Sequence, residues 1–315
     1  MKIVFFGTPE PAAKILEALI SSKHEIICVV TQPDRPKGRG QKITLPPVKE
    51  IALRHNLRIE QPERVKNNPT LKALLETIKP DIAVVVAYGK IFPKDILTIP
   101  QYGFINVHAS LLPSYRGAAP IQWALLNGEK ETGVTIMQVD ELLDAGPIIL
   151  QEKVRIEEND NAETLLKKVF SVGQTLLLEG LEAIEKGTAK YFPQKDAAAT
   201  FAPAITKESG EIDWKKTDTE IHNRIRALVV WPGAHTICHG KILKILRSEI
   251  GTTQGEGRIE LPGTIVQVVK NIGLVVATGE GNLLIKEVQP EGKKPMSAYD
   301  FVIGHDVKTA ETLPN

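Results

Sequence analysis

The first half of the chain alternates short apolar runs with stretches in which apolar residues recur at helical spacing. Short apolar runs bounded by Gly, Pro or polar residues are typical of buried parallel strands. The expected strands are 3–6, 25–31, 81–87, 103–108, 133–139 and 148–154, and the expected helices are 11–21, 48–57, 70–79 and 120–128. This alternation predicts a Rossmann-like α/β fold with a doubly wound, mostly parallel sheet.

A long helical pattern follows over residues 161–186 and ends the first half of the chain. Gly173 and Gly180 lie inside it, where a glycine costs about 1 kcal/mol relative to alanine. The two glycines therefore either permit close packing of the helix or mark a bend.

The pattern changes after this helix. Residues 190–206 contain prolines and alanines without a sustained period, so we expect a linker there. Thr217 and Glu220 form a capping box that opens a helix, and short strands with glycine turns follow it. These strands predict a small antiparallel, OB-like β-barrel. The predicted domains are an N-terminal α/β domain over 1–189 and a C-terminal barrel over 207–315.

The composition of the chain indicates a globular protein of two domains and excludes a disulfide-stabilised one. The chain has 315 residues and 42% hydrophobic residues, enough for two packed domains, and its formal net charge is +1. Any polyanionic partner must therefore be held by local basic patches. Cys28 and Cys238 lack metal-ligand or redox spacing, which indicates a reducing compartment and no cysteine metal site. The N-terminal apolar run is too short for a signal peptide or membrane span, so we expect a cytoplasmic protein without membrane association. We also expect a monomer.

The stretch 103–117 is the first candidate for chemistry. Strand alternation places Asn106 and His108 on one face at the end of a strand, where open α/β sheets bind ligands. An amide and an imidazole can there meet one substrate atom. The structural alternative is a half-buried histidine that hydrogen-bonds to the backbone.

Asp144 is the second candidate. It lies after the strand 133–139, and a parallel strand would bring it to the same sheet edge as His108. The structural alternative is a turn aspartate before Ala-Gly-Pro.

Residues 32–49 form a Gly/Pro-rich loop with five basic residues and one acid, Asp34. Such a loop is usually a solvated connector. This one leaves the carboxyl end of the second strand, so it can overhang the same crevice.

Several of these elements, in this order, resemble the folate-dependent formyltransferases. The matching residues are Asn106-x-His108, Ser110-Leu111-Leu112-Pro113, Arg116-Gly117 and Asp144 within 140–147. The resemblance implies that the catalytic residues Asn106, His108 and Asp144 surround the formyl group of 10-formyltetrahydrofolate. It also implies that Ser110, Leu111, Leu112 and Pro113 line the folate site, and that no metal takes part.

The basic loop is similar to an inserted loop that, in part of this family, contacts the acceptor end of tRNA. The resemblance therefore implies methionyl-tRNA as the formyl acceptor and some tRNA contact by the C-terminal barrel. The tRNA-binding residues implied are Arg35, Lys37, Arg39 and Lys42, with Arg39 the best placed.

Formyl transfer to an amine needs stabilisation of a developing oxyanion and movement of a proton. We expect Asn106 to donate a hydrogen bond to the formyl oxygen and His108, as imidazolium, to donate a second one or a proton. Asp144 would pair with the imidazolium and take or relay the proton of the amine.

Two other functions remain open at this point. A formyltransferase for a small amine, such as glycinamide ribonucleotide or an amino-sugar nucleotide, would share the three polar residues but would not need the basic loop. A non-catalytic RNA-binding protein on an enzyme scaffold would share the fold but would transfer no formyl group.

Overall fold

A computed structural model describes residues 1–37, 42–251 and 260–314, and Arg39 therefore lies outside the described residues. The chain divides into two compact units. One comprises Met1–Pro120, Glu131–Arg155 and Leu166–Pro203, and the other comprises Ile121–Lys130, Ile156–Leu165 and Ala204–Asn315. The break at Pro203 falls inside the expected linker 190–206, but the domain boundaries themselves stay a prediction.

The first unit is built on a seven-stranded sheet with the strand order β10-β9-β7-β6-β1-β2-β5. The strands are β1 (Lys2–Gly7), β2 (Glu25–Val30), β5 (Ile59–Glu60), β6 (Ile82–Val86), β7 (Phe104–His108), β9 (Glu131–Gln138) and β10 (Ile148–Arg155). Strands β7, β6, β1, β2 and β5 run parallel, which confirms the predicted mostly parallel α/β fold.

The direction of β9 differs from the prediction. It runs antiparallel to β7, with Gln138 opposite Ile105 and Thr135 opposite His108. The carboxyl end of β9 therefore lies beside the start of β7, so the expected route of Asp144 to the site was wrong. Asp144 instead lies in the connection from β9 to β10, which also pair antiparallel.

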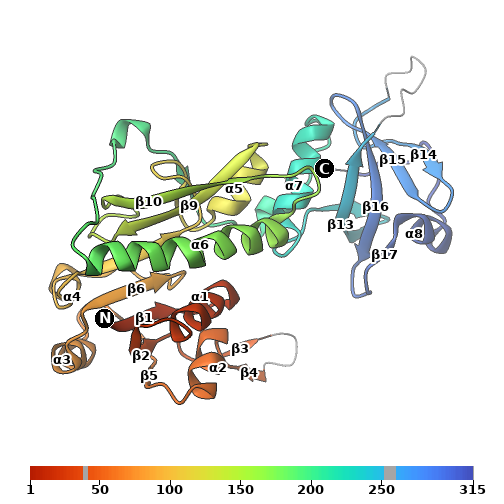
Figure 1. Ribbon diagram of the computed structural model, residues 1–315. Coiled ribbons are helices and arrows are strands. Elements are labelled where there is room, and N and C mark those ends of the chain that lie inside the picture. The colour runs from red at the N-terminus through yellow and green to blue at the C-terminus, as the bar shows by residue number, and fades with distance from the viewer. Residues whose placement is uncertain (38–41, 252–259, 315) are drawn as a thin grey trace. The chain divides into compact units, whose positions relative to one another are not determined.

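The helices of the first part of the chain are α1 (Glu10–Ile20), α2 (Pro47–Arg54), α3 (Pro69–Ile78), α4 (Lys94–Leu97), α5 (Pro120–Leu126) and α6 (Ala162–Glu185), and α6 runs along the sheet (Figure 1). A Cβ atom on Gly173 would lie 3.2 Å from Val107 and from Val134. The glycine therefore permits close packing of α6 against the sheet.

The packing of Val107 also fixes the orientation of the residues beside it. Because Val107 faces α6, strand alternation directs Asn106 and His108 to the opposite face. Phe104 lies on that opposite face too, in a core cluster with Phe6. On this face of β7 the apolar residue Phe104 is therefore followed by the polar residues Asn106 and His108, toward the end of the strand.

The basic loop after β2 contains a short hairpin, β3 (Arg35–Lys37) and β4 (Lys42–Thr44) (Figure 1). Arg35 pairs with Thr44 and Lys37 with Lys42. The loop is therefore not structureless along its described length, although the side chains of Lys37 and Lys42 are not described.

The second unit contains an antiparallel sheet with the order β12-β13-β16-β15-β14, and β17 pairs with β16. Its elements are α7 (Asp218–Leu228), β12 (His235–Cys238), β13 (Lys241–Ile250), β14 (Ile265–Val269), β15 (Gly273–Ala277), β16 (Asn282–Pro290), β17 (Met296–Ser297) and α8 (Ala298–His305). The predicted capping box is confirmed, since the hydroxyl of Thr217 accepts from Glu220 N and the Glu220 carboxylate accepts from Thr217 N. Trp214 is fully buried in the core under this sheet.

Across the described ranges of the chain, none of the helices is both long enough and apolar enough to cross a membrane.

Candidate active site

The end of β7 holds the first two candidate residues. His108 is only 5% exposed, and its Nε2 lies 3.0 Å from the carbonyl oxygen of Tyr115. Asn106 is half-buried, and within the described residues its side-chain amide makes no hydrogen bond. The histidine therefore has a fixed orientation, and the amide of Asn106 is available to a ligand.

Asp144 meets His108 from the β9–β10 connection. Its Oδ2 lies 3.7 Å from His108 Nδ1 and accepts a hydrogen bond of 2.9 Å from the main-chain N of Gly117. A separation of 3.7 Å is too long for a hydrogen bond, so Nδ1 can still meet a substrate atom. The sequence predicted that Asp144 and His108 lie close together, and they do. The predicted parallel direction of the strand before Asp144 was wrong.

A polar network centred on the buried side chain of Thr135 holds the loop that follows His108. The hydroxyl of Thr135 donates to Ser110 O at 2.6 Å and accepts from Leu112 N at 3.2 Å. Gln151 Nε2 donates to Leu112 O and to the Thr135 hydroxyl at 2.8 and 2.9 Å. Because buried polar groups are costly when unpaired, this network gives the loop a defined conformation.

The loop residues predicted to line the folate site have different environments. Ser110 is fully buried and its hydroxyl donates to Ser114 O at 2.6 Å, while Leu112 is 3% exposed. These two side chains hold the loop from inside. Leu111 and Pro113 are partly exposed, so only they could present side-chain surface to a ligand.

The base of the basic hairpin is held by polar side chains. Asp34 Oδ2 lies 2.6 Å from Lys49 Nζ, and Gln61 Nε2 donates to Asp34 Oδ1 at 2.8 Å and to Gln32 O at 2.9 Å. The hydrogen bonds from Lys49 and Gln61 lower the pKa of Asp34 below its ordinary value. The predicted contact residue Arg35 begins β3 directly after this cluster.

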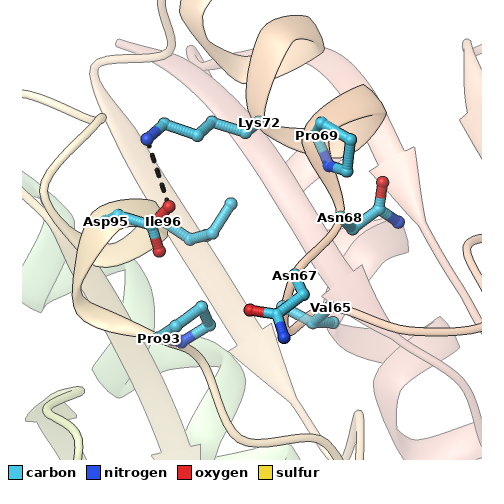
Figure 2. A pocket seen from close by; sticks show the side chains of 8 residues that line it. All are labelled: Val65, Asn67, Asn68, Pro69, Lys72, Pro93, Asp95 and Ile96. Carbon is cyan, nitrogen blue, oxygen red and sulfur yellow. Dashed lines mark hydrogen bonds and ion pairs between the residues drawn. The ribbon is translucent and has the colours of Figure 1, made fainter.

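A surface pocket of about 230 Å³ lies elsewhere in the first unit, between α3 and α4. Lys72 Nζ lies 3.1 Å from Asp95 Oδ2 in its lining, and Figure 2 draws this ion pair. Its lining includes none of the candidate residues. The candidate site is therefore defined by its converging polar groups and not by this pocket. The described residues also contain no group of three potential metal ligands.

Sequence reasoning missed the residues that support the site. Thr135 could have been found, because it is a polar residue within an apolar run of a central strand. Gln151 and Gln194 carried no local signal, since one lies in an exposed strand pattern and the other in the expected linker.

The fold and this set of polar residues define a class of group-transfer enzyme. The chain belongs to the formyl transferase family, because residues 1–181 match "Formyl transferase" and residues 204–306 match "Formyl transferase, C-terminal domain". The resemblance inferred from the motifs is thus confirmed.

Individual relatives cover the whole chain. The chain is 47% identical over 313 residues to the methionyl-tRNA formyltransferase of Caldanaerobacter subterraneus subsp. tengcongensis, covering 99% of this chain and 100% of the relative. It is 49% identical over 316 residues to the methionyl-tRNA formyltransferase of Caldicellulosiruptor saccharolyticus, with the same coverage of both chains.

Solved structures agree with this fold. WlaRD, a sugar 3N-formyl transferase crystallised with dTDP and 5-N-formyl-THF, is 24% identical with a TM-score of 0.67, covering 93% of this chain and 99% of that one. An N-formyltransferase from Helicobacter canadensis is 23% identical with a TM-score of 0.65, covering 92% of this chain and 99% of that one.

Proposed function

We propose that this protein transfers the formyl group of 10-formyltetrahydrofolate to the α-amino group of methionyl-tRNA, for translation initiation. The relatives that match it from end to end are named methionyl-tRNA formyltransferases, which supports methionyl-tRNA as the acceptor. The observation that carries the proposal within the molecule is the approach of Asp144 to His108, on the same strand face as the half-buried side chain of Asn106. These groups supply the hydrogen-bond donors and the proton acceptor that formyl transfer requires.

Each of the three residues has a defined part in the reaction. Asn106 donates an N–H to the formyl oxygen, and His108 offers its Nδ1–H to the same oxygen as negative charge develops there. Asp144 accepts the proton that leaves the amine as the new C–N bond forms. The bond from the formyl carbon to the folate nitrogen then breaks, and the proton held by Asp144 passes to that nitrogen, which regenerates the carboxylate.

The loop before Asp144 suits the folate that supplies the formyl group. Leu142 and Leu143 are 69% and 56% exposed, which leaves apolar surface directly beside Asp144 for one face of a ring system. Leu111 and Pro113 add partly exposed surface on the loop after β7. In this proposal Ser110 and Leu112 contribute through the main chain.

The basic hairpin meets the tRNA in this proposal. Arg35, Lys37, Arg39 and Lys42 bring positive charge to the loop after β2, which compensates for an overall charge of only +1. The C-terminal unit adds further tRNA contacts. On its sheet, however, Lys286 pairs with Glu249 at 2.6 Å, which offsets part of its positive charge.

The proposed cellular compartment follows from methionyl-tRNA as the formyl acceptor. Methionyl-tRNA is used where translation begins, so we place the reaction in the cytoplasm. We also propose that the chain acts as a monomer, and light scattering after size exclusion would test that.

Assay of formyl transfer from 10-formyltetrahydrofolate to charged initiator tRNA tests the proposal directly. Glycinamide ribonucleotide and an amino-sugar nucleotide serve as competing acceptors in the same assay. We expect transfer to methionyl-tRNA and little to either small amine. Efficient transfer to a small amine only would replace the tRNA assignment, and no transfer at all would support a non-catalytic RNA-binding role.

A further inference from the structure

A segment that follows α6 lies against both loops of the candidate active site. Phe192 and Ile148 exchange two main-chain hydrogen bonds, of 2.9 and 2.8 Å, just beyond Asp144. Nine residues farther on, β11 (Phe201–Ala202) begins and pairs in parallel with β8 (Arg116–Gly117). We call residues 192–202 the strap, because they connect the two loops from outside.

The strap approaches Gly117 so closely that only a residue without a side chain fits there. Its φ is +128°, and a Cβ there would lie 2.6 Å from the carbonyl oxygen of Ala202. Only glycine leaves room for the strap at this point. The main-chain N of the same residue donates to the carboxylate of Asp144.

The side-chain amide of Gln194, in the strap, both donates and accepts hydrogen bonds at the site. Its Nε2 donates to Asp144 O at 2.9 Å and to Gly146 O at 2.8 Å. Its Oε1 accepts from Arg116 Nε at 3.1 Å and from a terminal nitrogen of Arg116 at 2.9 Å. Two carbonyls on one side and a guanidinium on the other allow only this orientation of the amide.

Arg116 is itself held in place. Its side chain is almost fully buried, and its terminal nitrogen also lies 2.9 Å from the exposed carboxylate of Asp196. A buried guanidinium must keep its acceptors, so Arg116 in turn restrains Gln194.

The backbone at Asp144 needs such restraint. Asp144 has φ of +48°, in the left-handed region that non-glycine residues seldom adopt. Residues in this region keep their conformation when the surroundings hold them in several ways. Gln194 restrains the two carbonyls of this turn, and Gly117 restrains the carboxylate.

We propose that Gln194 is a positioning residue that sets the backbone of Asp144, and through it the placement of the Asp144 carboxylate beside His108. This inference rests on the proposed function, since it assigns how that site is aligned. Gln194 touches no substrate in this role and acts only through the main chain of the Asp144 turn.

Gln194→Met tests the proposal, because it keeps the length of the side chain and removes all four hydrogen bonds. A small misplacement of a reacting group can cost about 10²-fold in rate. We expect kcat to fall roughly 10- to 100-fold, with KM for folate and for methionyl-tRNA nearly unchanged. Gln194→Glu should behave like Gln194→Met, since it keeps the acceptor for Arg116 but turns an oxygen toward two carbonyls. The exposed neighbour Lys195→Met is the control and should keep the parent kcat.

Two further measurements separate positioning from general stability. In an Asp144→Asn background, Gln194→Met should cause little further loss, because the group that it positions is already gone. The ring ¹⁵N shifts of His108 in Gln194→Met should move in the direction seen in Asp144→Asn, and this comparison needs no substrate.

A parent-like kcat in Gln194→Met would overturn the inference. So would a loss that is equally large in the Asp144→Asn background and follows a lowered Tm. If the parent fails to formylate methionyl-tRNA, the proposed function fails instead, while the ¹⁵N comparison still judges the role of Gln194.

Discussion

Two loop systems of the first unit are held in different ways. The loops around His108 and Asp144 are fastened by hydrogen bonds of two enclosed side chains, Thr135, which is fully buried, and Arg116, which is almost fully buried. The basic hairpin is held at its base by Asp34 and Lys49, whose side chains are 26% and 17% exposed.

The difference matches what each loop system has to do. Stabilising charge on a formyl oxygen requires donors that are already in place, because reorganising them during the reaction costs free energy. Binding a phosphate chain relies on long-range charge and on counterion release, which tolerate less exact placement. Changes in the first system should therefore reduce turnover, and changes in the second should reduce the use of tRNA.

The largest expected effect is at His108. His108→Gln keeps a donor for the Tyr115 carbonyl but cannot act as an imidazolium, so kcat should fall on the order of 10²-fold or more. The melting temperature should stay close to that of the parent. A variant that retains turnover but unfolds at a clearly lower temperature would favour the core-histidine alternative.

The next effect concerns the hairpin. The variant Arg35/Arg39/Lys42→Ala should weaken use of methionyl-tRNA by roughly 1–3 kcal/mol, leave the KM for folate unchanged and make the salt dependence of tRNA binding shallower. Removing three exposed lysines elsewhere, in Lys14/Lys153/Lys186→Ala, controls for net charge. If both triple variants lose tRNA use equally, the hairpin has no specific role.

The smallest effect is expected at the base of the hairpin. Asp34→Asn removes the partner of Lys49 and should slightly lower the melting temperature at neutral pH. Because the folded-state pKa of Asp34 is lowered, its contribution is present above the ordinary carboxyl pKa and is lost as the pH falls through the folded value.

The melting temperatures of parent and Asp34→Asn should therefore converge as the pH falls below the ordinary carboxyl pKa and through the lowered folded-state pKa of Asp34. The exposed pair Lys72–Asp95 offers a matched control in Asp95→Asn. A difference between parent and Asp34→Asn that persists at low pH would mean that the pair does not stabilise the hairpin through its charge.

Much of this could be predicted from local patterns. Apolar runs and helical spacing are set by neighbouring residues, so β1, β2, β6, β7 and the capping box at Thr217 were predicted close to their observed positions. The two-residue strand β5 was not predicted. The residue types of Asn106, His108 and Asp144, in their motifs, were enough to indicate the family and the chemistry. The twofold strand period also placed Asn106 and His108 on one face.

Only the tertiary structure decided how these residues are held together. The apolar run of β9 reads the same in either direction, and its antiparallel pairing depends on contacts with β7 that no local pattern encodes. Gln194 lies 50 residues from Asp144 along the chain and in a segment without periodicity. Its hydrogen bonds exist because the strap packs across both loops, and such long-range contacts are determined by the whole fold and not by the residues that surround Gln194 in the sequence.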